Sequence, residues 1–196
     1  MKDERRKEGM KVGIFGGSFN PVHFGHIGLA KWVIANTDID ELWLMVSPNN
    51  PLKEASRLAP EAERLAAVRK AVQDIPHVEA SDFEFTLPRP SYTANTLRAL
   101  QQAYPQHEFT LVIGEDNLAI FTRWREYEYI LENFRIFVYP RHDDNPSGEA
   151  GRAAERSSIE SGLLENFVSV KELRILIEAP YFDISSTSIR RSQGLQ

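Results

Sequence analysis

The chain has 196 residues, of which 42% are hydrophobic and 26% charged, a composition typical of a soluble globular domain with a sizeable core. Its formal net charge of −5 argues against a general nucleic-acid-binding protein, which usually presents a basic face. The absence of cysteine excludes a disulfide framework, thiolate metal ligands and a cysteine nucleophile, and it agrees with a reducing cytoplasm.

The N-terminal residues 1–9 mix both charge signs and lack an apolar segment, so we interpret them as a flexible leader rather than a secretory signal. No apolar run approaches the ~18 residues that a membrane span needs. We therefore expect a cytoplasmic protein with no membrane partner. Residues 10–196 contain no internal repeat, low-complexity tract or boundary, and they predict a single domain.

Along the chain, short apolar runs rich in β-formers alternate with helical patterns. The expected strands are residues 11–15, 41–47, 77–85, 109–113, 134–139 and 174–177. The expected helices are residues 26–36, a helix that opens near Glu61, residues 92–104 and part of 120–131, with a polar loop at 142–151. This alternation predicts right-handed βαβ units and hence an α/β fold, a Rossmann-like doubly wound parallel sheet with flanking helices. Ligands of such sheets bind beyond the carboxyl ends of the strands.

A glycine-rich turn follows the first expected strand, in the segment Gly16-Gly17-Ser18-Phe19, and leads to two histidines. The glycines permit close backbone approach to a ligand, and the following helix start favours an anion. His23 and His26 are three residues apart, so one helical turn places both on the same side. Each part alone could be a plain turn or an ordinary histidine, but their combination predicts a phosphate site. Zinc is the rival explanation, yet no obvious third ligand lies nearby in the sequence.

The segment His23-Phe24-Gly25-His26 resembles the first signature of the nucleotidyltransferase superfamily. The far end agrees, because Ile184-Ser185-Ser186-Thr187-Ser188-Ile189-Arg190 is similar to the second signature of that superfamily. The alternative for this second segment is a serine-rich helix cap. The resemblance implies an ATP phosphate site that includes Gly16, Gly17, Ser18, Phe19, His23, His26, Ser186, Thr187 and Arg190.

The middle of the chain resembles one branch of that superfamily, the bacterial nicotinate-nucleotide adenylyltransferases. The resemblance rests on Ser91-Tyr92-Thr93 with Thr96-Leu97, and on Gly114-Glu115-Asp116 with Trp124 ten residues beyond the glycine. It implies that Gly114 and Asp116 contact adenosine and that Trp124 stacks on a pyridine ring. It also implies that the nicotinate carboxylate accepts hydrogen bonds at Thr93 and just after Trp124. The implied acceptor site is therefore Tyr92, Thr93, Trp124 and Arg125, although Tyr92 and Trp124 could also be packing residues.

The sequence departs from that family in four places. Asn20 stands where many relatives have Asp, and the segment 48–53 is short, which leaves Lys53 as its cation. Arg125 stands where an aromatic residue is common, a change that a backbone contact would survive. The chain ends at Gln196, soon after Arg190, where relatives continue into another helix. This last difference bears on stability and on homo-oligomer formation more than on chemistry.

The resemblance implies attack of a mononucleotide 5′-phosphate on the α-phosphorus of ATP, with release of pyrophosphate. The nucleophile is already an anion, so positioning and electrostatics suffice and no general base is needed. We assign catalysis to His23, His26, Lys53 and Arg190. Mg²⁺ is expected to arrive with ATP, because it keeps several waters and uses phosphates as ligands, and no dedicated protein metal site is expected.

The expected partners are therefore ATP and nicotinate mononucleotide, the precursors of nicotinate adenine dinucleotide. Two alternatives stay open at this point. One is an adenylyltransferase that acts on pantetheine phosphate or nicotinamide mononucleotide. The other is a nucleotide-sensing protein on the same fold that has no catalytic activity, against which intact His23, His26 and Arg190 argue.

Overall fold

A computed structural model describes residues 9–48, 58–140, 170–176 and 178–179. Its described strands form one sheet in the order β3-β2-β1-β4-β5-β6, and every neighbouring pair is parallel. The strands are β1 (Lys11–Gly17), β2 (Glu41–Val46), β3 (Val78–Ser81), β4 (Glu108–Gly114), β5 (Arg135–Tyr139) and β6 (Glu172–Ile175). This order confirms the predicted Rossmann-like parallel sheet.

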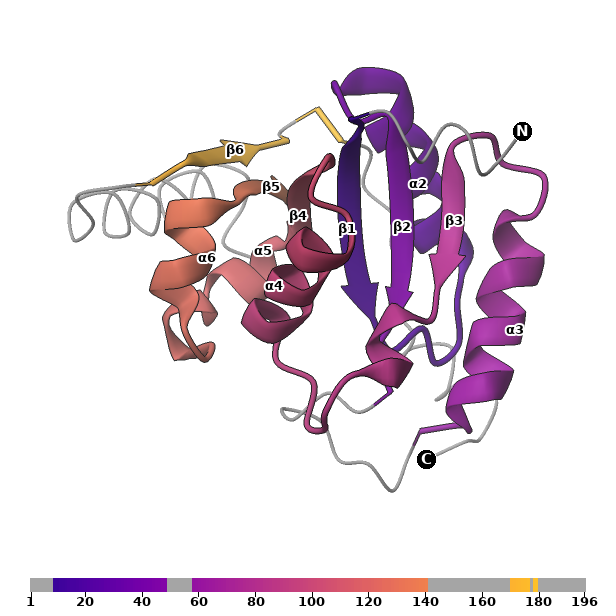
Figure 1. The fold of residues 1–196 in the computed structure, drawn as a ribbon. Helices are drawn as coiled ribbons and strands as arrows, with labels where there is room; N and C mark the ends of the chain where they lie inside the picture. The colour runs from indigo at the N-terminus through magenta and orange to yellow at the C-terminus, as the bar shows by residue number, and fades with distance from the viewer. Residues whose placement is uncertain (1–8, 49–57, 141–169, 177, 180–196) are drawn as a thin grey trace, which may run out of the picture.

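The α-helices are α2 (Phe24–Asn36), α3 (Glu61–Val72), α4 (Thr93–Ala103), α5 (Glu115–Leu118) and α6 (Tyr127–Asn133). Two 3₁₀ turns, η2 (Phe83–Thr86) and η3 (Phe121–Arg123), precede α4 and α6. In Figure 1, α4 and α6 stand in front of the sheet while α2 passes behind it. No helix of the described part is long and apolar enough to cross a membrane.

Two hydrophobic layers hold these helices against the sheet, one on each face. Alternate residues of β1 point to opposite faces, as the strand pleat requires. Val12 and Ile14 pack in one layer with the α4 and α6 leucines, whereas Phe15 packs in the other with α2 and α3. The central strands β2, β4 and β5 are buried on both faces, which explains their nearly continuous apolar sequences.

Two sequence predictions need correction. The expected strand 77–85 is shorter, because β3 pairs with β2 only as far as Met45 opposite Ser81, and the chain then turns into η2. The hydroxyl of Ser81 accepts the Phe83 N–H at 3.3 Å, which helps to end the strand. The predicted final strand 174–177 is observed as β6, two residues earlier in the chain. The predicted loop 142–151 lies outside the described residues.

The strand order reverses direction between β1 and β4, so the chain winds outward from this central pair on both sides. The carboxyl ends of β1, β2 and β3 point to the same edge in Figure 1, where η2 and the start of α4 also lie. A crevice at such a switch point is the usual ligand site of an open α/β sheet.

The opposite, amino edge of the sheet carries an ion-pair network centred on Arg135 at the start of β5. Its guanidinium donates to both carboxylate oxygens of Asp38, at 3.1 and 2.9 Å, and to Glu172 at 2.8 Å. Lys11 at the start of β1 joins Asp38 at 2.7 Å. The network therefore ties β1, β5 and β6 to the turn before β2. These bonds hold the pKa of the Asp38 carboxyl at about 2, with Arg135 the main cause.

Candidate active site

The turn that follows β1 contains the two glycines that the sequence singled out. A Cβ atom at Gly16 would meet no atom within 4 Å, so this position opens onto free space. A Cβ atom at Gly17 would lie 3.1 Å from the ring of Phe19, which is buried beneath the turn. Phe19 itself has a φ of 44°, which bends the chain sharply toward α2. Packing thus fixes Gly17, whereas Gly16 leaves the backbone accessible to a ligand.

The two histidines meet at the start of α2, as the spacing predicted. His23 is the residue that precedes the helix, and its carbonyl accepts the His26 N–H at 3.0 Å. The His23 N–H in turn donates to Nδ1 of His26 at 3.2 Å, and the ring centres lie 3.7 Å apart. Phe19 packs edge-on against His26 with 4.9 Å between the ring centres. The backbone and Phe19 therefore hold the two imidazoles side by side at a helix N-terminus, where an anion is favoured.

A buried arginine on α3 joins the glycine turn to the end of β2. The side chain of Arg64 is 3% exposed and donates to the carbonyls of Ser18 at 2.7 Å and Ser47 at 2.8 Å. It also donates to the carbonyls of Pro48 at 3.1 Å and Ala59 at 2.9 Å. Burial lowers the pKa of Arg64, and these carbonyls stabilise its charge. Sequence reasoning missed this residue, because three of its four partners lie 16 or more residues away in the chain.

A cavity of about 330 Å³ opens beside the glycine turn, at the carboxyl ends of β1, β2 and β4. Gly16, Gly17 and Gly114 line it, together with the predicted acceptor residues Tyr92, Thr93, Trp124 and Arg125. The structure thus brings the two motifs together in one cavity. His23 and His26 are not among its lining residues; the link to them is Phe15, which lines the cavity and whose ring centre lies 5.9 Å from that of His26.

The wall opposite the glycines is built from the start of α4 and the segment that contains η3. The N–H groups of Asn95 and Thr96 bond to the carbonyl of Tyr92, at 2.9 and 3.1 Å. The N–H groups of Thr93 and Ala94 come earlier in the first turn of α4. Such N–H groups have no carbonyl within their own helix to bind, so they can donate to a ligand. Trp124 packs on Phe121 with 5.2 Å between ring centres, and the Arg125 guanidinium lies 4.9 Å from the Tyr92 ring centre.

Three residues that line this cavity each carry a buried polar atom with no hydrogen-bond partner among the described residues: Glu84 Oε2, Ser91 Oγ and Trp124 Nε1. Buried polar atoms are normally paired, so each such atom in a native structure calls for an explanation. Their convergence on one cavity is the arrangement expected of a polar ligand site.

Glu84 is the second residue that sequence reasoning missed. It is 8% exposed, and its Oε1 accepts a hydrogen bond from Thr96 Oγ1 at 2.9 Å. Burial raises the pKa of the Glu84 carboxyl, while the nearby hydroxyls of Thr96 and Ser47 oppose the rise; of the two, Thr96 is the one within hydrogen-bond geometry. No local signal marks it, because an acid between Phe83 and Phe85 is expected to face solvent in an alternating strand pattern.

The remaining predicted residues fall into two groups. Asp116 is exposed on α5 and lies outside the lining of the cavity, whereas Gly114 and Asn117 belong to it. Asn20, at the position where relatives have Asp, is buried and accepts the Ala59 N–H at 3.3 Å. Four predicted residues lie outside the described residues: Lys53, Ser186, Thr187 and Arg190.

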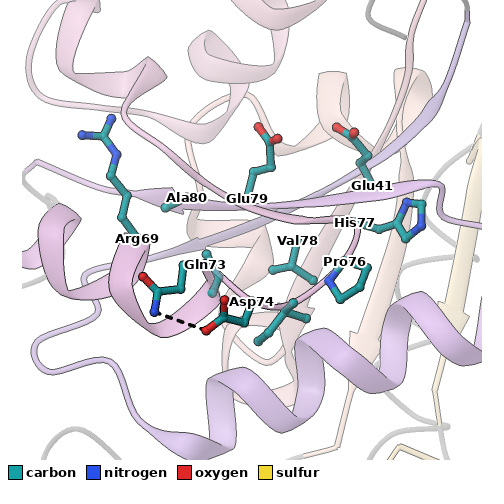
Figure 2. Close-up of a pocket in the computed structure, with 11 residues that line it drawn as sticks. Glu41, Arg69, Gln73, Asp74, Pro76, His77, Val78, Glu79 and Ala80 are labelled. Atoms are coloured by element: carbon teal, nitrogen blue, oxygen red, sulfur yellow. Dashed lines mark hydrogen bonds between the residues drawn. The ribbon is translucent and has the colours of Figure 1, made fainter. Parts of the chain in front are cut away.

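A second cavity of about 570 Å³ lies along the edge strand β3 and the end of α3 (Figure 2). Charged side chains such as Glu41, Arg69 and Glu79 surround it. It includes the amino ends of β2 and β3, whereas ligands of these sheets bind at the carboxyl ends. Within the described ranges, no group of three histidine or acidic side chains could hold a metal ion.

The switch-point crevice, the open glycine turn and the anion-favouring helix start with its paired imidazoles define an α/β protein that binds nucleotide phosphates. The cytidylyltransferase-like family model matches residues 14–192. The chain therefore belongs to the cytidylyltransferase-like family, in the branch of the nicotinate-nucleotide adenylyltransferases.

Two curated relatives illustrate that branch, and each is described as a "Probable nicotinate-nucleotide adenylyltransferase". The protein of Cytophaga hutchinsonii is 44% identical over 92% of this chain and 84% of its own. The protein of Flavobacterium johnsoniae is 41% identical over 93% of this chain and 86% of its own. Among solved structures, the Plasmodium falciparum nicotinic acid mononucleotide adenylyltransferase complexed with NaAD covers 93% of this chain and 83% of its own. Its TM-score is 0.69 at 16% identity, a likeness that supports the fold.

Proposed function

We propose that this protein catalyses adenylyl transfer from ATP to nicotinate mononucleotide, giving nicotinate adenine dinucleotide and pyrophosphate. The observation that carries the proposal is the single cavity that joins the glycine turn of β1 to the start of α4 and Trp124. The sequence relatives support the same activity. We place the reaction in the cytoplasm, in keeping with a chain that contains no cysteine.

In the proposed reaction, an oxygen of the mononucleotide 5′-phosphate forms a bond to the α-phosphorus of ATP while the bond to pyrophosphate breaks. The nucleophile needs no deprotonation, so the protein must align two anions and stabilise the charge that moves onto the leaving group. We assign this work to the imidazoles of His23 and His26 and to the N–H groups at the start of α2. Arg64 keeps the turn in place, because its guanidinium holds the Ser18 carbonyl.

The adenosine and phosphate contacts follow from the same assignment. Gly16, Gly17, Ser18 and Gly114 offer backbone that a nucleotide can approach, whereas the buried ring of Phe19 supports His26 from below. Asp116 would have to reach adenosine from the exposed surface of α5. We assign Lys53, Ser186, Thr187 and Arg190 to the ATP phosphates on the resemblance alone. Arg190→Ala should then weaken ATP binding in calorimetry and leave mononucleotide binding nearly unchanged.

Mg²⁺ belongs to this proposal as part of the ATP complex. The described residues contain no cluster that could hold it unaided, and Mg²⁺ in such enzymes is bound mainly by phosphates and water. When bound, it neutralises charge on the phosphates.

The acceptor end of the cavity is suited to an aromatic ring that bears an anionic group. Trp124 offers an indole face, and the first turn of α4 offers N–H donors to a carboxylate. A carboxamide would bring its NH₂ group toward those donors and leave them badly paired, at a cost on the order of 1–3 kcal/mol. Charge-assisted hydrogen bonds widen the difference.

Pyrophosphate release from ATP tests the proposal. The acceptors are nicotinate mononucleotide, nicotinamide mononucleotide and pantetheine phosphate, with a reaction that lacks any acceptor as the blank. We expect kcat/KM to be at least ~10²-fold higher for nicotinate mononucleotide than for its amide, since about 1.4 kcal/mol corresponds to tenfold. Comparable values would overturn the acceptor assignment, and no release with any acceptor would indicate a nucleotide sensor. Trp124→Ala should raise the KM of the mononucleotide and spare that of ATP.

A further inference from the structure

The buried acid Glu84 has no role in the reaction described so far, yet it lines the acceptor end of the cavity. It extends from η2 toward the first turn of α4, where Thr96 binds its Oε1 at 2.9 Å. The other oxygen, Oε2, has no hydrogen-bond partner in the described part of the chain. Ser91 Oγ, directly before the N-terminus of α4, is buried and unpaired in the same wall. A polar ligand group bound in the cavity would give these atoms the partners that buried polar atoms normally have.

The proposed position of the substrate carboxylate creates an electrostatic conflict with Glu84. The start of α4 favours one anion through its free N–H groups and its dipole. Two carboxylates in one desolvated site repel each other, and such pairs usually keep one proton between them. A neutral carboxylic acid in an apolar site can instead donate a hydrogen bond to a substrate anion. The environment of Glu84, which is 8% exposed and lies beside the uncharged hydroxyls of Thr96 and Ser47, favours that neutral form.

We propose that Glu84 is a specificity-determining residue that, in its protonated form, donates a hydrogen bond from Oε2 to the carboxylate of the pyridine acceptor. The inference rests on the proposed function. No covalent bond changes, because the proton stays between the two carboxyl groups while the substrate is bound. Deprotonated Glu84 would repel the nicotinate carboxylate but accept a hydrogen bond from the NH₂ group of nicotinamide. The acceptor preference of the enzyme therefore depends on pH.

The ionisable surroundings of Glu84 allow this dependence to be isolated. The end of β2 and the first turn of α4 present Ser47 and Thr96, which do not titrate. The other ionisable side chains that face the cavity are Tyr92, Tyr139, Arg123 and Arg125. Nicotinate and nicotinamide mononucleotides share the same ribose phosphate and react with the same ATP, and they differ only in the group that the pyridine ring carries. Effects confined to ATP or to the shared phosphate therefore cancel in the ratio of the two kcat/KM values, and the comparison with Glu84→Gln isolates the contribution of Glu84.

The test measures this ratio, nicotinate over nicotinamide mononucleotide, from pH 6 to pH 9 in wild type, Glu84→Gln and Glu79→Gln. We expect the wild-type ratio to fall at least ~10-fold as pH rises, because the neutral fraction of an acid falls tenfold per unit above its pKa. Glu84→Gln keeps the shape but cannot lose a proton, so its ratio should stay constant within about 2-fold. Glu79, a lining residue of the second cavity (Figure 2), is the control and should follow wild type.

Calorimetry gives a readout that a structural role for Glu84 would not change. Nicotinate mononucleotide should bind wild type with proton uptake at pH 8, seen as a binding enthalpy that depends on the buffer, and should bind Glu84→Gln without it. A wild-type ratio that is flat to pH 9, or a Glu84→Gln ratio that falls in parallel with wild type, would overturn the inference. An equal fall of kcat/KM for both acceptors in Glu84→Gln would also overturn the inference, since it would indicate that Glu84 contacts the ribose that the two acceptors share. Failure of the proposed function is distinguishable from these outcomes, because wild type would then form no dinucleotide product from either acceptor.

Discussion

Two buried ionisable side chains, Arg135 and Glu84, lie at opposite ends of the sheet and are each 8% exposed. Arg135 makes three hydrogen bonds to Asp38 and Glu172, so its charge is paired. Glu84 has one bond to Thr96 and an oxygen without a partner among the described residues. Equal burial thus has opposite consequences. The amino edge is complete without a ligand and stabilises the fold, whereas the carboxyl edge keeps polar groups available for one.

The largest effect should come from the histidine pair at the carboxyl edge. We expect His26→Ala to lower kcat at least ~10²-fold with the fold intact, because it removes a donor directed at developing charge. Steady-state pyrophosphate release and circular dichroism measure the two properties. His77→Asn is the matched control, since His77 is exposed and its φ of 63° suits asparagine. Near-normal turnover in His26→Ala would refute the assignment of this imidazole.

A smaller loss of activity should follow from Arg64, which joins the glycine turn to β2. Arg64→Lys keeps the charge but cannot donate to four carbonyls at once. We expect kcat/KM to fall about 10-fold and the free energy of unfolding to fall by about 2–3 kcal/mol, because buried carbonyls lose their donors. Urea unfolding measures the change in the free energy of unfolding, and the pyrophosphate-release assay measures the change in kcat/KM.

The control for Arg64 lies on the same helix. Arg69→Lys changes an exposed arginine that pairs with Asp82 at 2.8 Å, and it should stay within about 0.5 kcal/mol of wild type. If Arg64→Lys lowered stability but left kcat/KM unchanged, Arg64 would belong with Arg135 as a purely structural residue.

The sequence was most informative where structure depends on neighbours in the chain. The strands β1 and β4 and the helix α2 lie within two residues of their predicted bounds, because their apolar patterns are strong. The meeting of His23 and His26 follows from a spacing of three residues and a helix start. The end of β3 could not be predicted, since the alternation continues to Phe85 while its partner β2 ends at Val46.

The residues that sequence reasoning missed depend on contacts that are remote in the chain. Arg64 binds the carbonyl of Ser18, 46 residues away, and Glu84 binds Thr96, 12 residues away. Residue type alone predicts that an arginine and a glutamate face solvent. The helix expected within 120–131 is likewise split into η3 and α6, because Glu126 adopts a φ of 54° between them. No local pattern marks that position.

At the amino edge, breaking the network should change stability and leave activity intact. Asp38 has a pKa held at about 2, below its ordinary value of 3.8, so its contribution is present above pH 4 and is lost as pH falls toward 2. Because the Asp38 side chain is 42% exposed, solvent screening reduces this contribution to about 1 kcal/mol. Asp38→Asn should therefore unfold more easily than wild type at pH 7, and the difference should vanish near pH 2.

Denaturation at several pH values measures that difference, and kcat/KM for both substrates should match wild type. Asp74→Asn is the control at the same edge, because Asp74 is exposed and, within the described part of the chain, its carboxylate accepts a hydrogen bond only from Gln73, at 3.2 Å. A loss of activity in Asp38→Asn would show that the two edges of the sheet are coupled, contrary to the comparison above.

The smallest effect concerns the stability of the carboxyl edge itself and has the opposite sign. Burial raises the pKa of Glu84, so the folded state holds this proton more tightly than the unfolded state. At low pH the Glu84 side chain is neutral in both the folded and the unfolded protein, and its burial costs little. As pH rises above the ordinary pKa of a glutamate, the unfolded state ionises first, and the folded state loses stability until its own raised pKa is passed. Glu84→Gln cannot ionise, so relative to wild type it should become more stable as pH rises, by about 0.5–1 kcal/mol at pH 8. Urea unfolding without ligand at pH 4 and pH 8 measures the change. A stability difference between wild type and Glu84→Gln that is independent of pH would mean that Glu84 stays paired or solvated in the free protein, and the carboxyl edge would then be as complete as the amino edge.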